Sequence, residues 1–195
     1  MSSHLTGPAS HPTYDPAASA VRVRGLCRGT SDRGALHGID LDIAHGEFVA
    51  VVGHRGSGKT TLLRALSGDD KATGTGYVRV PDEIARLKPV VGPSLRGGVE
   101  LLLGDDPFAA LDPITRARMH LLLRSYYELQ RPAVLLVTHD LDEAIMLAER
   151  VVVLEAGRVR ADVPVPRVPR HSEEYVALRA RLAAELEHGK VAETA

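Results

Sequence analysis

The sequence FVAVVGHRGSGKTT, residues 48–61, predicts the central elements of the fold. Its first five residues form a continuous apolar run that ends at a glycine, which is typical of a strand buried on both faces of an α/β sheet. After the glycine-rich segment, Leu62, Leu63 and Leu66 fall on one helical face, and Gly68 is the residue type that ends a helix. The order strand, glycine-rich loop, helix therefore predicts an α/β fold.

The loop itself matches the pattern G-x-x-x-x-G-K-T and reads Gly53-His54-Arg55-Gly56-Ser57-Gly58-Lys59-Thr60. Its glycines let backbone N–H groups turn toward phosphate oxygens, and the start of the next helix adds positive dipole. We expect Lys59 to neutralise the β- and γ-phosphates and Thr60 to offer its hydroxyl to Mg²⁺. With Thr61, these residues are the predicted binding set for Mg-ATP. The plainer alternative is a chance glycine turn, but the position between a buried strand and an amphipathic helix favours the phosphate loop.

Carboxylates and a histidine follow two further apolar runs. Residues 101–104 read as a second buried strand that delivers Asp105 and Asp106 at its carboxyl end, where open α/β sheets bind their ligands. Asp105 is the expected magnesium ligand beside Thr60, and Asp106 is placed to orient the attacking water or to accept its proton. Residues 133–138 read as a third strand ending at His139, a candidate γ-phosphate sensor. The plainer alternatives are acidic residues that merely end a strand and a surface or core histidine.

The remaining elements complete the predicted fold. Alternating residues at 21–24 and 39–43 indicate antiparallel or edge-like strands, and residues 76–80 a further strand. Residues 151–162 read as a hairpin turning at Ala156-Gly157. We expect a mostly parallel sheet with helices on both faces and an antiparallel β edge.

Local signals place three more helices. Asp112 and Pro113 begin a helix that runs to about residue 130. Asp140, with Glu143 three residues later, predicts a capping box on a short helix. A last amphipathic helix, residues 172–188, carries one apolar face made of Tyr175, Leu178, Leu182 and Leu186.

Composition limits the classes of partner. The chain has 195 residues and a net charge of -1, with 24 basic and 25 acidic residues spread along it, so no nucleic-acid or anionic-lipid surface is indicated. The single Cys27 cannot form an intramolecular disulfide, which fits a reducing cytoplasm. No apolar run approaches the roughly 20 residues that cross a bilayer, so any membrane role is expected to be peripheral. We expect a tail at 1–20, one nucleotide-binding domain at 21–162, and a linker with the last helix at 163–195.

The motifs together resemble one protein family. Residues 53–61, LLLGDDPF at 101–108, ALD at 110–112 and VTHD at 137–140 resemble the ATP-binding subunit of ABC transporters. Pro107-Phe108 with Leu111-Asp112 is similar to that family's D-loop region, and His139 to its switch histidine. A phosphate-loop kinase or GTPase would match the loop alone. Within the family, the likeness is strongest to importers of nitrate, taurine and aliphatic sulfonates, with aliphatic sulfonates the first choice.

The resemblance implies an activity and an assembly. It implies ATP hydrolysis with Asp106 and His139 as catalytic residues and with ATP and Mg²⁺ bound by the phosphate loop, Thr60 and Asp105. It also implies a homodimer on the cytoplasmic face of the cell membrane, in a complex with integral-membrane permease subunits and a solute-binding protein.

The sequence departs from this family in three places. Lys59 and Asp105 are 46 positions apart with no glutamine between them, too close to hold the family's helical subdomain, Q-loop glutamine and LSGGQ signature. LRGGV at 95–99 is either a trace of that signature or a glycine turn.

The loop at 26–30 lacks the aromatic residue that stacks on adenine, which predicts weaker ATP binding. Asp106 replaces a glutamate, which predicts slow hydrolysis. The alternative function is a degenerate nucleotide-binding relative without hydrolysis or transport coupling.

Overall fold

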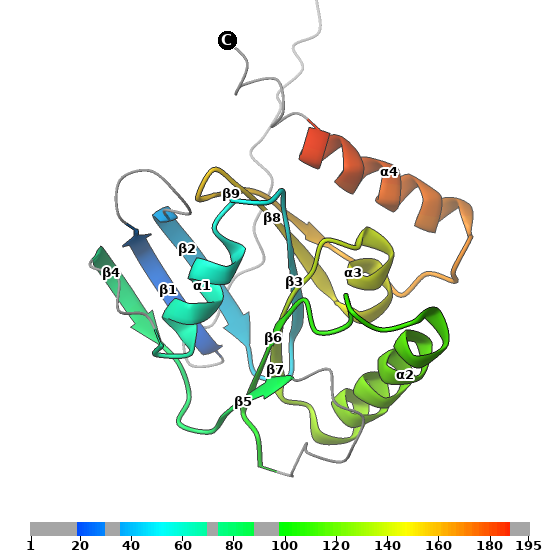
Figure 1. Cartoon of the computed structure of the whole chain (residues 1–195), viewed down its shortest axis with the longest axis horizontal. Coiled ribbons are helices and arrows are strands. Elements are labelled where there is room, and N and C mark those ends of the chain that lie inside the picture. Colours follow the sequence, from blue (N-terminus) through cyan, green and yellow to red (C-terminus); the bar gives the residue numbers. More distant parts are fainter. Residues whose placement is uncertain (1–18, 30–35, 70–73, 88–97, 188–195) are drawn as a thin grey trace, which may run out of the picture.

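The computed structural model describes residues 19–29, 36–69, 74–87 and 98–187. Its centre is a six-stranded sheet in the order β5-β6-β7-β3-β8-β9 (Figure 1). The first five strands in that order are parallel, and β9 pairs antiparallel with β8 at one edge. The bounds are β3 Phe48–Val52, β5 Ile84–Leu87, β6 Leu101–Asp105, β7 Ala133–Val137, β8 Arg150–Glu155 and β9 Arg158–Pro164. The predicted mostly parallel sheet with an antiparallel edge is confirmed.

A second, three-stranded antiparallel sheet lies beside the first. It has the order β2-β1-β4 and consists of β1 Ser19–Arg28, β2 Leu36–Ala44 and β4 Gly74–Arg79. β1 and β2 contain the predicted strands at 21–24 and 39–43. β1 also takes in Ser19 and Ala20, both 4% exposed, because Ser19 pairs with Ala44 of β2. Ser19 and Ala20 therefore do not belong to the tail expected at 1–20, and the rest of that prediction, residues 1–18, lies outside the described residues.

Helices cover both faces of the central sheet, as Figure 1 makes visible on either side of β3. α1, Lys59–Leu66, packs Leu62, Leu63 and Leu66 into the core shared with the three-stranded sheet. On the opposite face lie α2 Pro113–Gln130, α3 Leu141–Leu147 and α4 Glu173–Glu187. The side chains of β3 alternate between these two cores, with Val49 and Val51 in the first and Phe48, Ala50 and Val52 in the second. The strand that carries the phosphate loop is thus buried on both faces.

The end of the chain's described part is attached to α3. Tyr175 and Leu182 of α4 are buried, and Leu178 and Leu186 pack against the same core, which confirms the predicted apolar face. The Tyr175 hydroxyl and the Arg179 guanidinium both donate to Asp142 Oδ1, at 2.7 and 2.8 Å. The last helix is therefore part of the packed domain.

Local sequence signals predicted the start of α2 and the turn between β8 and β9. Asp112 accepts hydrogen bonds from the N–H groups of Ile114 and Thr115, both at 3.1 Å, with Pro113 at the first helical position. The β8–β9 hairpin turns at Ala156 and Gly157, whose φ values are +42° and +73°. These two predictions are confirmed.

The prediction of a capping box at α3 is correct for Asp140 and wrong for Glu143. Asp140 accepts from the N–H groups of Asp142 and Glu143, at 2.9 and 3.2 Å, as predicted. The Asp140 N–H, however, donates to the Thr138 hydroxyl and not to the Glu143 carboxylate. Glu143 is 3% exposed, and a buried carboxylate is drawn to the donors around it, here Thr138 and His120.

The segment between α1 and α2 is where the sequence predicts a shortened helical subdomain. Its described parts, residues 67–69, 74–87 and 98–112, contain no helix, which agrees with a reduced helical subdomain. The edge strand β5 falls here and was not predicted from the sequence. Most of LRGGV at 95–99 lies outside the described residues, so its two interpretations stay open.

Candidate functional site

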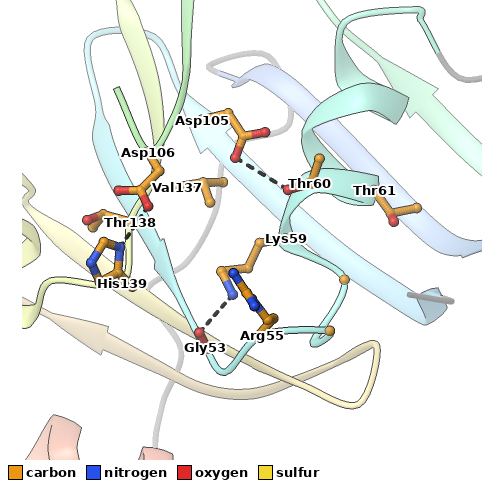
Figure 2. A pocket seen from close by; sticks show the side chains of 12 residues that line it. Gly53, Arg55, Lys59, Thr60, Thr61, Asp105, Asp106, Val137, Thr138 and His139 are labelled. Atoms are coloured by element: carbon orange, nitrogen blue, oxygen red, sulfur yellow. Dashed lines mark hydrogen bonds and ion pairs between the residues drawn. The ribbon is translucent and has the colours of Figure 1, made fainter. Parts of the chain in front are cut away.

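The carboxyl ends of three neighbouring strands converge on one pocket. β3 delivers the phosphate loop, β6 delivers the two aspartates, and β7 delivers the histidine segment (Figure 2). The pocket has a volume of about 560 Å³. It is lined by Gly53, Arg55, Gly56, Gly58, Lys59, Thr60, Thr61, Asp105, Asp106, Val137, Thr138 and His139. Every expected site residue except His54 and Ser57 therefore lines one pocket, to which Val137 and Thr138 are added.

The phosphate loop is braced by the β8–β9 hairpin. A Cβ atom at Gly53 would collide with the Leu154 carbonyl oxygen and lie 2.6 Å from Ser57 Oγ, so only glycine fits there. The Ser57 carbonyl accepts from the Gly157 N–H at 3.0 Å. Gly56 and Gly58 have φ values of +85° and +103°, which only glycine adopts readily. The loop conformation is thus fixed by contacts that do not involve a ligand.

Lys59 lies between the loop and the carboxylates. Its Nζ donates to the carbonyl oxygens of Gly53 and His54, both at 2.7 Å, and to Ser57 Oγ at 3.3 Å. Burial lowers the pKa of Lys59 from its ordinary value, against the opposing effect of Asp105 and Asp106. A partly desolvated amine in this position attracts an anionic group more strongly than one in bulk water.

Two oxygen groups from different elements face each other across the pocket. Thr60 Oγ1, in the first turn of α1, lies 3.4 Å from Asp105 Oδ1, at the end of β6 (Figure 2). Hydroxyl and carboxylate oxygens are the hard ligands that Mg²⁺ takes in nucleotide sites, where waters and phosphate oxygens complete the octahedron. Among the described residues no group of three His, Cys, Asp or Glu side chains is arranged to hold a metal by itself. The donor set fits a cation that arrives with a phosphate ligand.

Asp106 and His139 form a pair at the mouth of the pocket. His139 Nδ1 lies 2.7 Å from Asp106 Oδ2, and the two side chains are 67% and 35% exposed. Asp106 has a φ of +47°, in the left-handed region, where aspartate is among the better tolerated residues, and its N–H donates to the Val137 carbonyl at 2.8 Å. The backbone bond joins the end of β6 to the end of β7, which brings the two side chains together.

Two members of the predicted binding set point elsewhere. His54 Nε2 bonds the Leu186 carbonyl of α4 at 2.7 Å, so its ring turns away from the pocket. The Ser57 side chain is 5% exposed and receives the Lys59 amine. The Ser57 N–H donates to the His54 carbonyl at 3.2 Å. The predicted phosphate contacts of these two residues through their side chains therefore lack support in this geometry, and those through their main chain stay a prediction.

The sequence patterns did not predict one buried polar pair. His120 lies on the buried face of α2 with Leu123 and Tyr127, and it bonds Glu143 of α3. A polar residue at helical spacing within an apolar stripe was the available signal, although its partner, 23 positions later, was not deducible from that spacing.

Comparisons with known proteins agree with this geometry. The family profile described as ABC transporter matches residues 36–109. The chain is 44% identical to the aliphatic sulfonates import ATP-binding protein SsuB 2 of Nocardia farcinica, with 85% of this chain and 94% of the relative covered. It is 39% identical to the protein of the same name from Rhizobium johnstonii, with 94% and 100% covered.

These two alignments run over 225 and 248 positions, more than the 195 residues of this chain. Both relatives therefore have dozens of positions without a counterpart here.

Solved structures share the fold. A dimeric post-hydrolysis structure of the ATP-binding cassette MJ0796, bound to ADP and Pi, aligns with a TM-score of 0.63 at 20% identity, covering 76% of this chain and all of that one. CbiO1 from Clostridium perfringens, part of the ABC transporter complex cbiONQ, aligns with a TM-score of 0.65 at 18% identity, covering 90% and 99%. At these identities the likeness concerns the fold alone.

Proposed function

Because the chain belongs to the family of ABC transporter ATP-binding proteins, we propose that it is the ATP-binding, energy-coupling subunit of an importer of aliphatic sulfonates. The observation that carries this proposal is the convergence of the braced phosphate loop, the Thr60–Asp105 oxygen pair and the Asp106–His139 pair in one pocket. The solute class comes from the relatives, which are named as aliphatic sulfonate import proteins and cover most of this chain.

The phosphate loop would hold the triphosphate of ATP. Residues of the loop and of the first turn of α1 line the pocket. Backbone N–H groups there would cradle the phosphates, and Lys59 would supply a cation for the β- and γ-phosphates. Thr60 and Asp105 would hold Mg²⁺, which when bound neutralises charge on the phosphate oxygens. Arg55 also lines the pocket and adds a second positive charge.

Asp106 and His139 would act on the attacking water and on the γ-phosphate. The Asp106 carboxylate is accessible at the pocket mouth and can accept a hydrogen bond from water. His139, held at 2.7 Å from that carboxylate, presents its ring to the same space and can donate to a phosphate oxygen as negative charge develops there.

The proposed assembly is a homodimer docked on permease subunits at the cytoplasmic face of the membrane, working with a solute-binding protein. Two similar solved structures are described as dimeric structures of one cassette, MJ0796. Across the described residues no helix is long and apolar enough to span a bilayer.

A second candidate function is nucleotide binding without transport coupling. The observation that favours it is the missing length: the relatives carry dozens of positions that this chain lacks, and its described residues between α1 and α2 contain no helix. In that case the site would bind Mg-ATP without docking to a permease.

Both candidate functions require that the chain binds Mg-ATP. Equilibrium binding of ATP to the purified chain, with and without Mg²⁺, tests this requirement. Lys59→Ala is expected to weaken binding by about 100-fold, since it removes a charge-assisted contact of roughly 1.5–3 kcal/mol and its electrostatic field. Arg64→Ala, on the exposed side of α1, removes a cation from the same helix and is expected to leave binding within about twofold.

Absence of ATP binding at millimolar concentration would contradict both functions. If binding is present, co-purification with the permease subunits separates the two: a stable complex supports the importer subunit, and its absence supports the uncoupled relative.

A further inference from the structure

A buried hydrogen-bond network lies directly behind His139. The hydroxyl of Thr138, a fully buried residue, donates to Glu143 Oε2 at 2.6 Å. The other oxygen of Glu143 bonds His120 Nε2 at 2.8 Å, and the two residues are 3% and 8% exposed. The network therefore joins the end of β7, α3 and α2 without a solvent-exposed member.

The charge state of Glu143 fixes the direction of these bonds. Burial alone would raise the pKa of Glu143, but the hydrogen bonds from His120 and Thr138 and the charges of His120 and Arg116 hold it below its ordinary value. The ionised carboxylate only accepts, so both neighbours donate to it. The Thr138 oxygen is then free to accept the Asp140 N–H, which lies at 3.1 Å.

The network holds both segments that meet at the pocket mouth. On one side, Thr138 donates its N–H to the Val51 carbonyl at 3.1 Å, and the Asp140 side chain caps α3. On the other side, the His120 ring packs edge-to-face on Phe108, with centroids 4.8 Å apart. Phe108 is two positions after Asp106, and His139 lies between Thr138 and Asp140.

We propose that Glu143 is a positioning residue which, through Thr138 and His120, aligns the His139 segment with the Asp106 segment so that their side chains meet. This rests on the proposed function, since it gives Asp106 and His139 their part in hydrolysis. Glu143 acts on this pair through its partners: Thr138 directly precedes His139, and His120 packs on Phe108.

The test compares Glu143→Gln with Glu128→Gln. Glu128 is exposed on α2, so Glu128→Gln is a control that makes the same chemical change outside the network. Thr138→Val keeps the side-chain shape and removes the hydroxyl. It replaces Glu143→Gln in the test if circular dichroism shows that Glu143→Gln does not fold.

The first readout is the imidazole ¹⁵N spectrum of His139 without nucleotide, assigned with His139→Gln and calibrated with Asp106→Asn, which removes the carboxylate. The second is the rate of ATP hydrolysis. We expect Glu143→Gln and Thr138→Val to move the His139 Nδ1 signal toward its position in Asp106→Asn. We also expect kcat to fall by about 10-fold or more, because ångström-scale misplacement is costly, while KM for ATP changes within about twofold.

Folded variants with an unchanged His139 signal and an unchanged kcat would overturn the proposal. Should the wild-type chain fail to hydrolyse ATP, the proposed catalytic function fails by itself, and the nucleotide-free spectrum still decides whether Glu143 positions His139. Glu128→Gln is expected to match the wild-type chain in both readouts.

Discussion

Two pairs of a histidine and a carboxylate, with nearly the same N···O distance, lie in different surroundings. His139 and Asp106 are 2.7 Å apart, with side chains 67% and 35% exposed. His120 and Glu143 are 2.8 Å apart, with side chains 10% and 3% exposed. Water weakens the His139–Asp106 pair and leaves both groups accessible to a ligand. The buried His120 and Glu143 side chains cannot replace their hydrogen bond with one to bulk water. The same chemical pair can therefore serve reaction at one place and architecture at the other.

The largest expected difference between the pairs is in stability. His120→Leu leaves the Glu143 carboxylate buried with one donor fewer, which is expected to cost about 3–5 kcal/mol in the free energy of unfolding. His139→Leu makes the same change at the exposed pair and is expected to cost within about 1 kcal/mol. Urea unfolding followed by circular dichroism measures both losses, and equal losses would show that burial does not distinguish the two pairs.

For the exposed histidine, we expect a large effect on ATP hydrolysis and a small effect on stability. His139→Leu should lower kcat for ATP hydrolysis by about 10²-fold, as for loss of one group that stabilises developing charge. Its urea midpoint should stay near that of the wild-type chain. A variant that hydrolyses ATP at the wild-type rate would remove His139 from the catalytic set.

A smaller effect concerns the length of the exposed carboxylate. Asp106→Glu advances the carboxylate by one methylene and is expected to raise kcat by about tenfold, part of the roughly 100-fold that a 1 Å misplacement can cost. The left-handed φ of +47° at this position favours aspartate over glutamate and limits the gain. Single-turnover hydrolysis provides the measurement, and an unchanged rate would argue against slow hydrolysis through carboxylate placement.

The smallest expected effect is a pH dependence specific to the buried pair. The pKa of Glu143 is lowered in the folded chain, so its contribution to stability is fully present above the unfolded pKa, about 4.3, and is lost as pH falls through the folded pKa. The stability difference between the wild-type chain and Glu143→Gln should therefore be constant at neutral pH and shrink on acidification below about pH 4. Urea unfolding between pH 3 and 7 measures this difference, and a difference independent of pH would contradict the expectation.

Sequence patterns succeeded where the governing chemistry is local. The phosphate loop, the apolar face of α1, the Asp112 cap and the Ala156-Gly157 turn each depend on neighbours within a few positions. Continuous apolar runs likewise identified β3, β6 and β7 as buried strands. The fold class follows from these elements alone.

Features governed by distant contacts could not be predicted in the same way. β5 reads Ile-Ala-Arg-Leu, a run without a clear period, and it forms a strand because it pairs with β6. His54 turns away from the pocket because of a carbonyl 132 positions later. Glu143 follows the spacing of a capping box, yet a histidine from another helix and the hydroxyl behind it bind its carboxylate.

The place of β3 within the sheet has a consequence for synthesis of the chain. β3 pairs with β7 on one side and β8 on the other, and both lie more than 80 positions later. A strand with five buried apolar residues therefore leaves the ribosome long before either neighbour exists. Such unpaired apolar segments are prone to aggregate and bind chaperones. The strand that holds the phosphate loop is among the first central elements to be made and among the last to be enclosed.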